Sequence, residues 1–317
     1  MKLTDRALIL AKIEATYGTD PTPVAASDAI LSSVPSFELV GSRKERNVAL
    51  PYYGKLPPIN VGEALKLSFS TELRGAGALP DTPPRIGALM RACNFTETID
   101  NTPASESTTY DPNSTVEGES VTIYFYVDGV LHKALGCVGS FKVSAKVNEV
   151  PTIDFEFIGL YAGTHVSDVA FPTPTFGDAA TPPIFHTAAF TFQTYSAIIE
   201  AINIDVGNSF GKRPDANDAT GVTRHFISGR EVKGDCDPEV PAISAFNPWD
   251  KFENSTEGAL SVSIGTVTQN RCTITMPKIT LDVPKHGERE SLLTYALSFT
   301  SHPSLTAGNN EVSIKFD

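Results

Sequence analysis

The sequence contains one succession of strand patterns twice, and this duplication limits the possible folds more than any other feature. Residues 121–159 are patterned as a strand, a turn, a longer strand, a short polar break and a further strand. Residues 260–299 repeat that order about 136 to 139 positions later. A supersecondary unit that recurs at a fixed spacing indicates a duplicated domain.

The duplication extends toward the N-terminal side of each unit. A strand pattern at 197–206 matches the one near Phe37, and a short helix pattern at 241–252 matches 84–93, both about 160 positions apart. The longer polar segment 94–120 in the first unit accounts for the change of spacing. We therefore predict a mainly β protein of two tandem β-sandwich or half-barrel domains, each with one short flanking helix.

The predicted boundaries follow the Pro-rich and Gly-rich segments. They give an N-terminal arm at 1–35, a first domain at 36–161, a linker at 162–190 and a second domain at 191–317. Apolar residues between positions 3 and 13 predict a short helix in the arm, and residues 207–221 are patterned as a polar loop.

Composition excludes several classes of protein. The formal net charge is −12, which disfavours ordinary nucleic-acid binding because that depends on Lys and Arg. No run of residues is long and apolar enough for a membrane helix or a signal peptide, so we expect a cytosolic product without a membrane partner. The four scattered cysteines are expected to be buried thiols.

A search for catalytic and ligand-binding motifs is negative. The six histidines have no metal-ligand spacing, and residues 215–226 lack the glycine and glutamate of a calcium loop. Residues 207–213 are one position short of a phosphate-binding loop and have Arg213 where Ser or Thr belongs. We therefore predict neither an enzyme nor a bound cofactor or metal.

Several segments carry a family resemblance. The N-terminal run 10–23 (LAKIEATYGTDPTP) resembles the opening of the long-tailed (siphophage) tail tube proteins, as do residues 120–133 (SVTIYFYVDGVLHK) and 149–161 (EVPTIDFEFIGLY). The segment 89–95 also matches in type and place. The resemblance covers the whole chain and is strongest over 10–161.

The resemblance implies a structural virion protein of the phage tail. Subunits of this family are β-sandwiches with a flanking helix, and they form sixfold rings that stack into a hollow tube through which DNA passes into the host. Two units per chain then suggest rings of three chains, a pseudo-hexamer. The implied partners are further copies of the chain, the tail tip or initiator, the tape measure and the tail terminator. Genomic DNA would pass without specific binding, and assembly would take place in the host cytoplasm.

Two sets of residues are candidates for these roles. Carboxylates that alternate with buried positions are candidates for the lumen surface, where they would repel DNA: Glu72, Asp154, Glu156 and Asp205. Residues of the arm and of the two long excursions are candidates for contacts between stacked rings: Tyr17, Arg43, Arg46, Tyr52, Tyr53, Lys212, Arg213 and Arg224.

Two alternatives remain open at this point. One is a receptor- or carbohydrate-binding β module of a phage fibre or baseplate, although such a module should expose clustered aromatic residues and the chain has one tryptophan, Trp249. The other is a true hexamer in which the second half is an outer decoration domain. The repeated helix argues against the second alternative.

Overall fold

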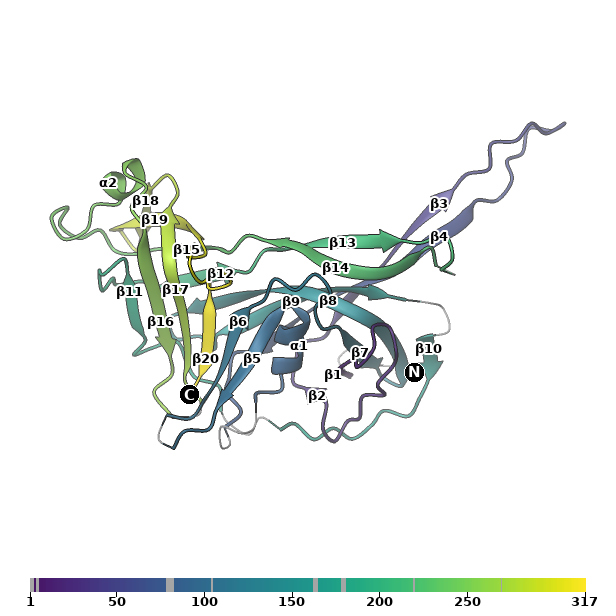
Figure 1. Ribbon diagram of the computed structural model, residues 1–317, viewed down its shortest axis with the longest axis horizontal. Helices are drawn as coiled ribbons and strands as arrows, with labels where there is room; N and C mark the ends of the chain where they lie inside the picture. The colour runs from purple at the N-terminus through teal and green to yellow at the C-terminus, as the bar shows by residue number, and fades with distance from the viewer. Residues whose placement is uncertain are drawn as a thin grey trace.

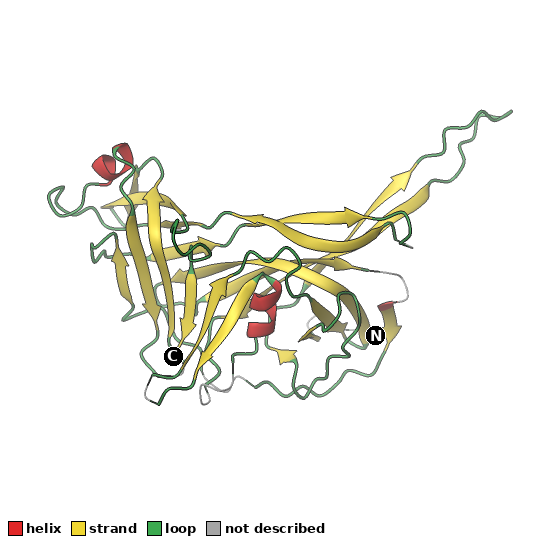
Figure 2. Ribbon diagram, viewed as in Figure 1, coloured by secondary structure: helices red, strands yellow, loops and turns green. Residues whose placement is uncertain are grey.

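The computed structural model describes residue 3 and residues 6–77, 83–103, 105–161, 165–177, 181–218, 220–268 and 270–317, without the side chains at 62 and 63. The fold is mainly β, as the sequence predicts, and Figure 2 shows strands in both halves of the chain. The helices are α1 (Gly87–Ala92) and α2 (Pro248–Glu253). No helix among the described residues is long and apolar enough to cross a membrane.

Among the described residues, ten strands precede position 170. They are β1 (Ala7–Ile13), β2 (Ala29–Ile30), β3 (Ser36–Lys44), β4 (Ile59–Glu72), β5 (Phe95–Asp100), β6 (Ser107–Pro112), β7 (Val121–Val127), β8 (Val130–Lys146), β9 (Thr152–Leu160) and β10 (Val166–Asp168).

Ten more strands lie in the described part of the second half. They are β11 (Ala189–Phe192), β12 (Ala201–Asp205), β13 (Asn208–Pro214), β14 (Val222–Arg230), β15 (Lys233–Cys236), β16 (Gly258–Ile264), β17 (Cys272–Leu281), β18 (Lys285–Arg289), β19 (Leu292–Ser301) and β20 (Ser313–Phe316).

The two halves have the same strand order. In the first half the antiparallel neighbours run β1–β7–β8–β9–β4–β3. In the second half they run β11–β16–β17–β19–β15–β12. Each half also has its one helix between the long hairpin and the strands that follow. The topology therefore supports the internal duplication, while the predicted domain boundaries remain predictions.

The halves are joined by strand pairing. β12 of the second half pairs antiparallel with the C-terminal part of β8 in the first half, over Ala201–Asp205 and Lys142–Lys146. A second junction pairs β20 with β6. Figure 1 shows the β13–β14 hairpin lying along β8 and β9, whereas the β3–β4 hairpin projects away from the body.

Alternation along the strands builds the core. Ile153, Phe155 and Phe157 on β9 are buried, and the residues between them are exposed or half-buried. Most of the buried apolar side chains form one cluster that spans both halves. Burial of apolar surface on this scale is the main source of stability for such a fold.

Two local predictions were wrong, and one polar segment contains a hairpin that was not predicted. The predicted N-terminal helix is strand β1, because its residues pair with β7 and both of its faces are covered, which produces a continuous apolar run. The polar segment 94–120 contains the β5–β6 hairpin, and the predicted loop 207–221 contains β13. In both hairpins the pairing and the tertiary contacts outweigh a polar, turn-rich composition.

A buried carboxylate fixes the bend in β8. Glu14 follows β1, is 7% exposed and accepts four hydrogen bonds. The donors are Gly18 N (2.7 Å), Gly136 N (2.7 Å), Ser120 Oγ (2.7 Å) and Thr122 Oγ1 (2.5 Å). Gly136 has a φ of 59°, in the left-handed region, at the point where β8 changes its pairing with β9.

Removing this carboxylate is expected to destabilise the protein. Glu14→Ala leaves four buried donors without an acceptor, and we expect a loss of about 3 kcal/mol in the free energy of unfolding. Urea denaturation measures the change. Glu14→Gln, which keeps the size and one acceptor, should lose less. A Glu14→Ala protein within about 0.5 kcal/mol of wild type would contradict this role.

Candidate functional site

The polar face of the central sheet is the first candidate surface. We define it as the outward-facing residues of β4, β9, β8, β12, β15 and β19. All four lumen candidates lie on it, with Glu72 on β4, Asp154 and Glu156 on β9, and Asp205 on β12. The structure therefore brings together the carboxylates selected from the sequence, and it does so across both halves of the chain.

Strand register aligns this face in rows. Asp154 pairs with Lys142, Lys142 with Asp205, and Asp205 with Lys233, so acidic and basic groups alternate across four strands. Opposite charges on directly facing residues stabilise a sheet by about 0.2–1 kcal/mol per pair. Ser70 extends the row on β4, and its hydroxyl donates to Asp154.

The polar face is close to electrically neutral. Its carboxylates are Glu72, Asp154, Glu156, Asp205 and Asp235, and its lysines are Lys66, Lys142, Lys146 and Lys233. Five negative groups against four positive ones leave one negative charge. The acidity of the whole chain is therefore located mostly elsewhere, and the lysines form no unbroken basic track along which phosphates could bind.

The candidates for contacts between rings fall into two groups. Arg43 lies on β3, and Arg46, Tyr52 and Tyr53 lie beyond it in the exposed tip of the β3–β4 hairpin. The other group lies on or under the β13–β14 hairpin: Tyr17, Lys212, Arg213 and Arg224.

Tyr17 and Arg224 contact each other inside one chain. The Arg224 guanidinium lies 4.5 Å from the centre of the Tyr17 ring, and His225 N donates to the Tyr17 hydroxyl at 2.7 Å. Burial raises the pKa of the Tyr17 hydroxyl. Arg224 also donates to the carbonyl oxygen of Gly118 at 2.9 Å. These contacts anchor the hairpin of the second half on the first half, while Lys212 and Arg213 remain exposed on β13.

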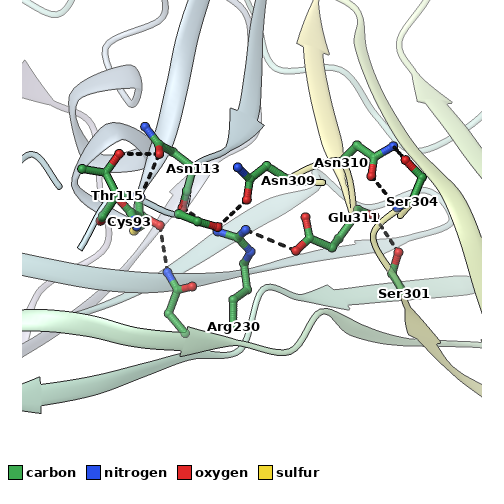
Figure 3. A network of polar contacts seen from close by, with 12 residues as sticks. Cys93, Asn113, Thr115, Arg230, Ser301, Ser304, Asn309, Asn310 and Glu311 are labelled. Atoms are coloured by element: carbon green, nitrogen blue, oxygen red, sulfur yellow. Dashed lines mark hydrogen bonds and ion pairs between the residues drawn. The ribbon is translucent and has the colours of Figure 1, made fainter. Parts of the chain in front are cut away.

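A buried polar network locks the base of the same hairpin, as Figure 3 shows. The side chain of Arg230 on β14 is 7% exposed and donates to Glu311 (3.3 Å) and to the carbonyl oxygen of Asn113 (3.2 Å). Asn208 on β13 donates to the carbonyl oxygens of Cys93 (2.8 Å) and Gly139 (2.9 Å). Segments of both halves are thereby held around one arginine.

Sequence reasoning missed the free edges of the central sheet. Among the described residues, β3 pairs only with β4, and β18 pairs only with β19. Phe37 and Leu39 on β3 belong to the core-facing set of their strand but are 45% and 57% exposed. Their alternation is visible in the sequence, whereas the absence of a covering neighbour is not.

The fold and the polar face define a mainly β protein of duplicated sandwich type, in which β3 and β18 leave the two ends of the central sheet unpaired among the described residues. A family model described as phage tail tube protein matches residues 4–312, and the chain belongs to this family. It is therefore a structural component of the phage tail. No curated protein sequence matches the chain.

Proposed function

We propose that this chain is the repeating subunit of a tail tube whose rings contain three chains, and that the polar face lines the channel through which DNA leaves the capsid. The observation that carries the proposal is the pairing of β12 with β8. It joins the two similar halves side by side within one chain and extends a single sheet through both. A contact of this head-to-tail kind closes a ring when it is repeated by rotation.

The number of strands supports a channel wide enough for DNA. Each half contributes four strands to the central sheet, β3, β4, β9 and β8 in the first and β12, β15, β19 and β18 in the second. Three chains then supply about 24 strands, and at a spacing of ~4.8 Å and a tilt of ~40° they close a barrel roughly 50 Å across. This leaves room for a DNA duplex inside the side chains.

The charge pattern suits passage of DNA rather than binding. Each lysine of the middle row faces a carboxylate, as Lys142 faces Asp154 and Asp205. Counterions screen exposed charges beyond about 8 Å at physiological salt, so only groups on the wall itself act on the duplex. A nearly neutral wall neither holds DNA nor opposes its entry. Further copies of the chain, the tail tip, the tape measure and the tail terminator complete the set of proposed partners.

Reversing wall charges should make the tube retain DNA. Glu156 and Asp235 lie directly opposite neutral residues on the adjacent strands, so Glu156→Lys with Asp235→Lys places no like charges directly opposite each other. The change does replace the exposed 3.7 Å ion pair between Glu156 and Lys66 by two positive groups. We expect assembled tubes of this variant to cosediment short duplex DNA at about 50 mM salt and to release it at about 200 mM.

The matched control is Asp100→Lys with Glu253→Lys, which makes the same charge change on β5 and α2, away from the polar face. Control tubes should resemble wild-type tubes, which retain little DNA. Equal retention by the two variants would show that the polar face does not line the channel.

Electron microscopy of the concentrated protein, with mass photometry of the same sample, tests the proposal as a whole. Hollow tubes, or rings with the mass of three chains, are expected. A discrete monomer that fails to polymerise even on virion tail tips would overturn the proposal and favour a binding module.

A further inference from the structure

The strand pairings establish which residues of the two halves are equivalent. Phe157 pairs with Leu67, and Phe299 pairs with Gly234. Taking Phe157 and Phe299 as equivalent makes Leu67 equivalent to Gly234, a shift of 142 positions on β9 and 167 on β4. Both long hairpins then have the same length, and each has one register shift close to its base, between Val40 and Ser42 in the first and, about two positions further along, between Ser209 and Phe210 in the second.

The offsets of 167 and 142 positions identify the strands that are equivalent to the two strands at the junction. Phe37 pairs with Leu67 and Ile204 pairs with Gly234, so β3 is equivalent to β12, and Glu38 is equivalent to Asp205. Lys142 pairs with Asp154 and Lys285 with Ala296, which are 142 positions apart, so β18 is equivalent to the C-terminal part of β8.

Positions that are exposed at the two open edges of the central sheet are buried where they recur at the junction between the halves. Ile204 and Val206 are 2% and 0% exposed, because β12 lies against β8. Their equivalents on β3, Phe37 and Leu39, are 45% and 57% exposed. Val283, beside the free edge of β18, is 60% exposed. Both unpaired edges thus carry apolar side chains that a strand pairing of the same kind as the junction would cover.

The long hairpins show the same relation. The β13–β14 ladder continues to the pair Pro214 and Val222, and this hairpin packs across β8 and β9. The β3–β4 ladder ends at Lys44 and Ile59, and its tip extends into solvent (Figure 1). The hairpin that has a surface to pack on is paired further along its length.

We propose that β3 of one chain pairs antiparallel with β18 of the next, with Glu38 opposite Lys285, and that the β3–β4 hairpin lies across β17 and β19 of that second chain. The proposal rests on the proposed ring function and specifies which surfaces close the ring. Charge complementarity supports it, since Asp205 faces Lys142 at the junction within the chain. Pro35 lacks an N–H, so the contact between chains has one hydrogen bond fewer.

An engineered disulfide tests this register. At the junction, Val206 N donates to Phe141 O, so Val206 and Phe141 are a hydrogen-bonded pair. Because the two kinds of pair alternate along antiparallel strands, the neighbouring pair of Asp205 and Lys142 is of the non-hydrogen-bonded kind, whose Cα atoms lie closer together. Such positions fit disulfide geometry. The test variant is Glu38→Cys with Lys285→Cys, at two exposed positions. The four natural cysteines are buried and free.

Two controls accompany the test variant. Asp205→Cys with Lys142→Cys makes the equivalent change at the junction. It should form a disulfide within one chain, so the protein should remain a monomer on a non-reducing gel. Each single variant, Glu38→Cys or Lys285→Cys, should remain monomeric on a non-reducing gel. Oxidation follows assembly, and microscopy of the same samples records whether tubes have formed.

The expected result is loss of the monomer band from the test variant and a ladder that ends at three chains. A ladder that ends at six would uphold the pairing and overturn the three-chain ring. Tubes without cross-links, while the junction control is oxidised, would overturn the pairing and leave the tube function intact. Monomers without rings or tubes, in wild type as well, would overturn the proposed function and this inference with it.

Discussion

A Leu39→Glu protein is expected to fold as the wild type does and to form no rings. Leu39 is more than half exposed in the single chain, so a carboxylate there remains hydrated. In the ring the same carboxylate would be buried against β18 without a partner, which costs several kcal/mol. The chain concentration needed for assembly should therefore rise at least about a hundredfold.

The equivalent position inside the chain provides the comparison for this prediction. Val206 is fully buried at the junction, so Val206→Glu should prevent stable folding, whereas Leu39→Glu should prevent only assembly. Leu305→Glu, at a fully exposed loop position, should affect neither. Thermal unfolding reports the fold, and light scattering with electron microscopy reports assembly. Rings from Leu39→Glu at wild-type concentration would contradict the proposed contact.

Arg230→Ala is expected to cost about 3–5 kcal/mol in the free energy of unfolding, because it leaves Glu311 charged in a poorly solvated site. It also removes the donor to Asn113 and loosens the base of the β13–β14 hairpin. The loss is measured by urea denaturation. An assembly defect should follow, since this hairpin sets the relation between the two halves.

Two controls separate this effect from a general loss of charge. Arg213→Ala removes an exposed arginine whose nearest carboxylate, on Glu117, is 4.0 Å away, and should change stability by less than about 1 kcal/mol. Arg230→Met with Glu311→Leu replaces the pair by apolar groups and should recover much of the loss. Equal stability of Arg230→Ala and Arg213→Ala would show that the buried network does not join the halves.

The sequence predicted the elements whose own residues carry a clear pattern. β4 and β9 have clean alternation, so their buried and exposed faces were predicted correctly. The first helix was expected at 84–93 and is found at Gly87–Ala92. The second helix was predicted at 241–252 but begins only at Pro248, which occupies its first turn, where the missing N–H costs nothing.

The missed elements depend on neighbours that a pattern cannot represent. β1 is buried on both faces, so its apolar residues do not alternate, and they imitate one face of a helix. β13 has mostly polar and basic residues, without a clean alternation, and is stabilised by packing on the first half. Alternation placed Asp154 and Asp205 outward, but only the strand register shows that Lys142 lies between them.

The number of chains in one ring of the assembled tube tests the central claim most directly. A cryo-electron microscopy reconstruction of the tube gives this number together with the strand order of the inner wall. We predict three chains per ring, with alternating halves around a continuous barrel and β3 beside β18 at each of three chain boundaries. Six chains per ring, with one half of each chain outside the inner wall, would contradict the account.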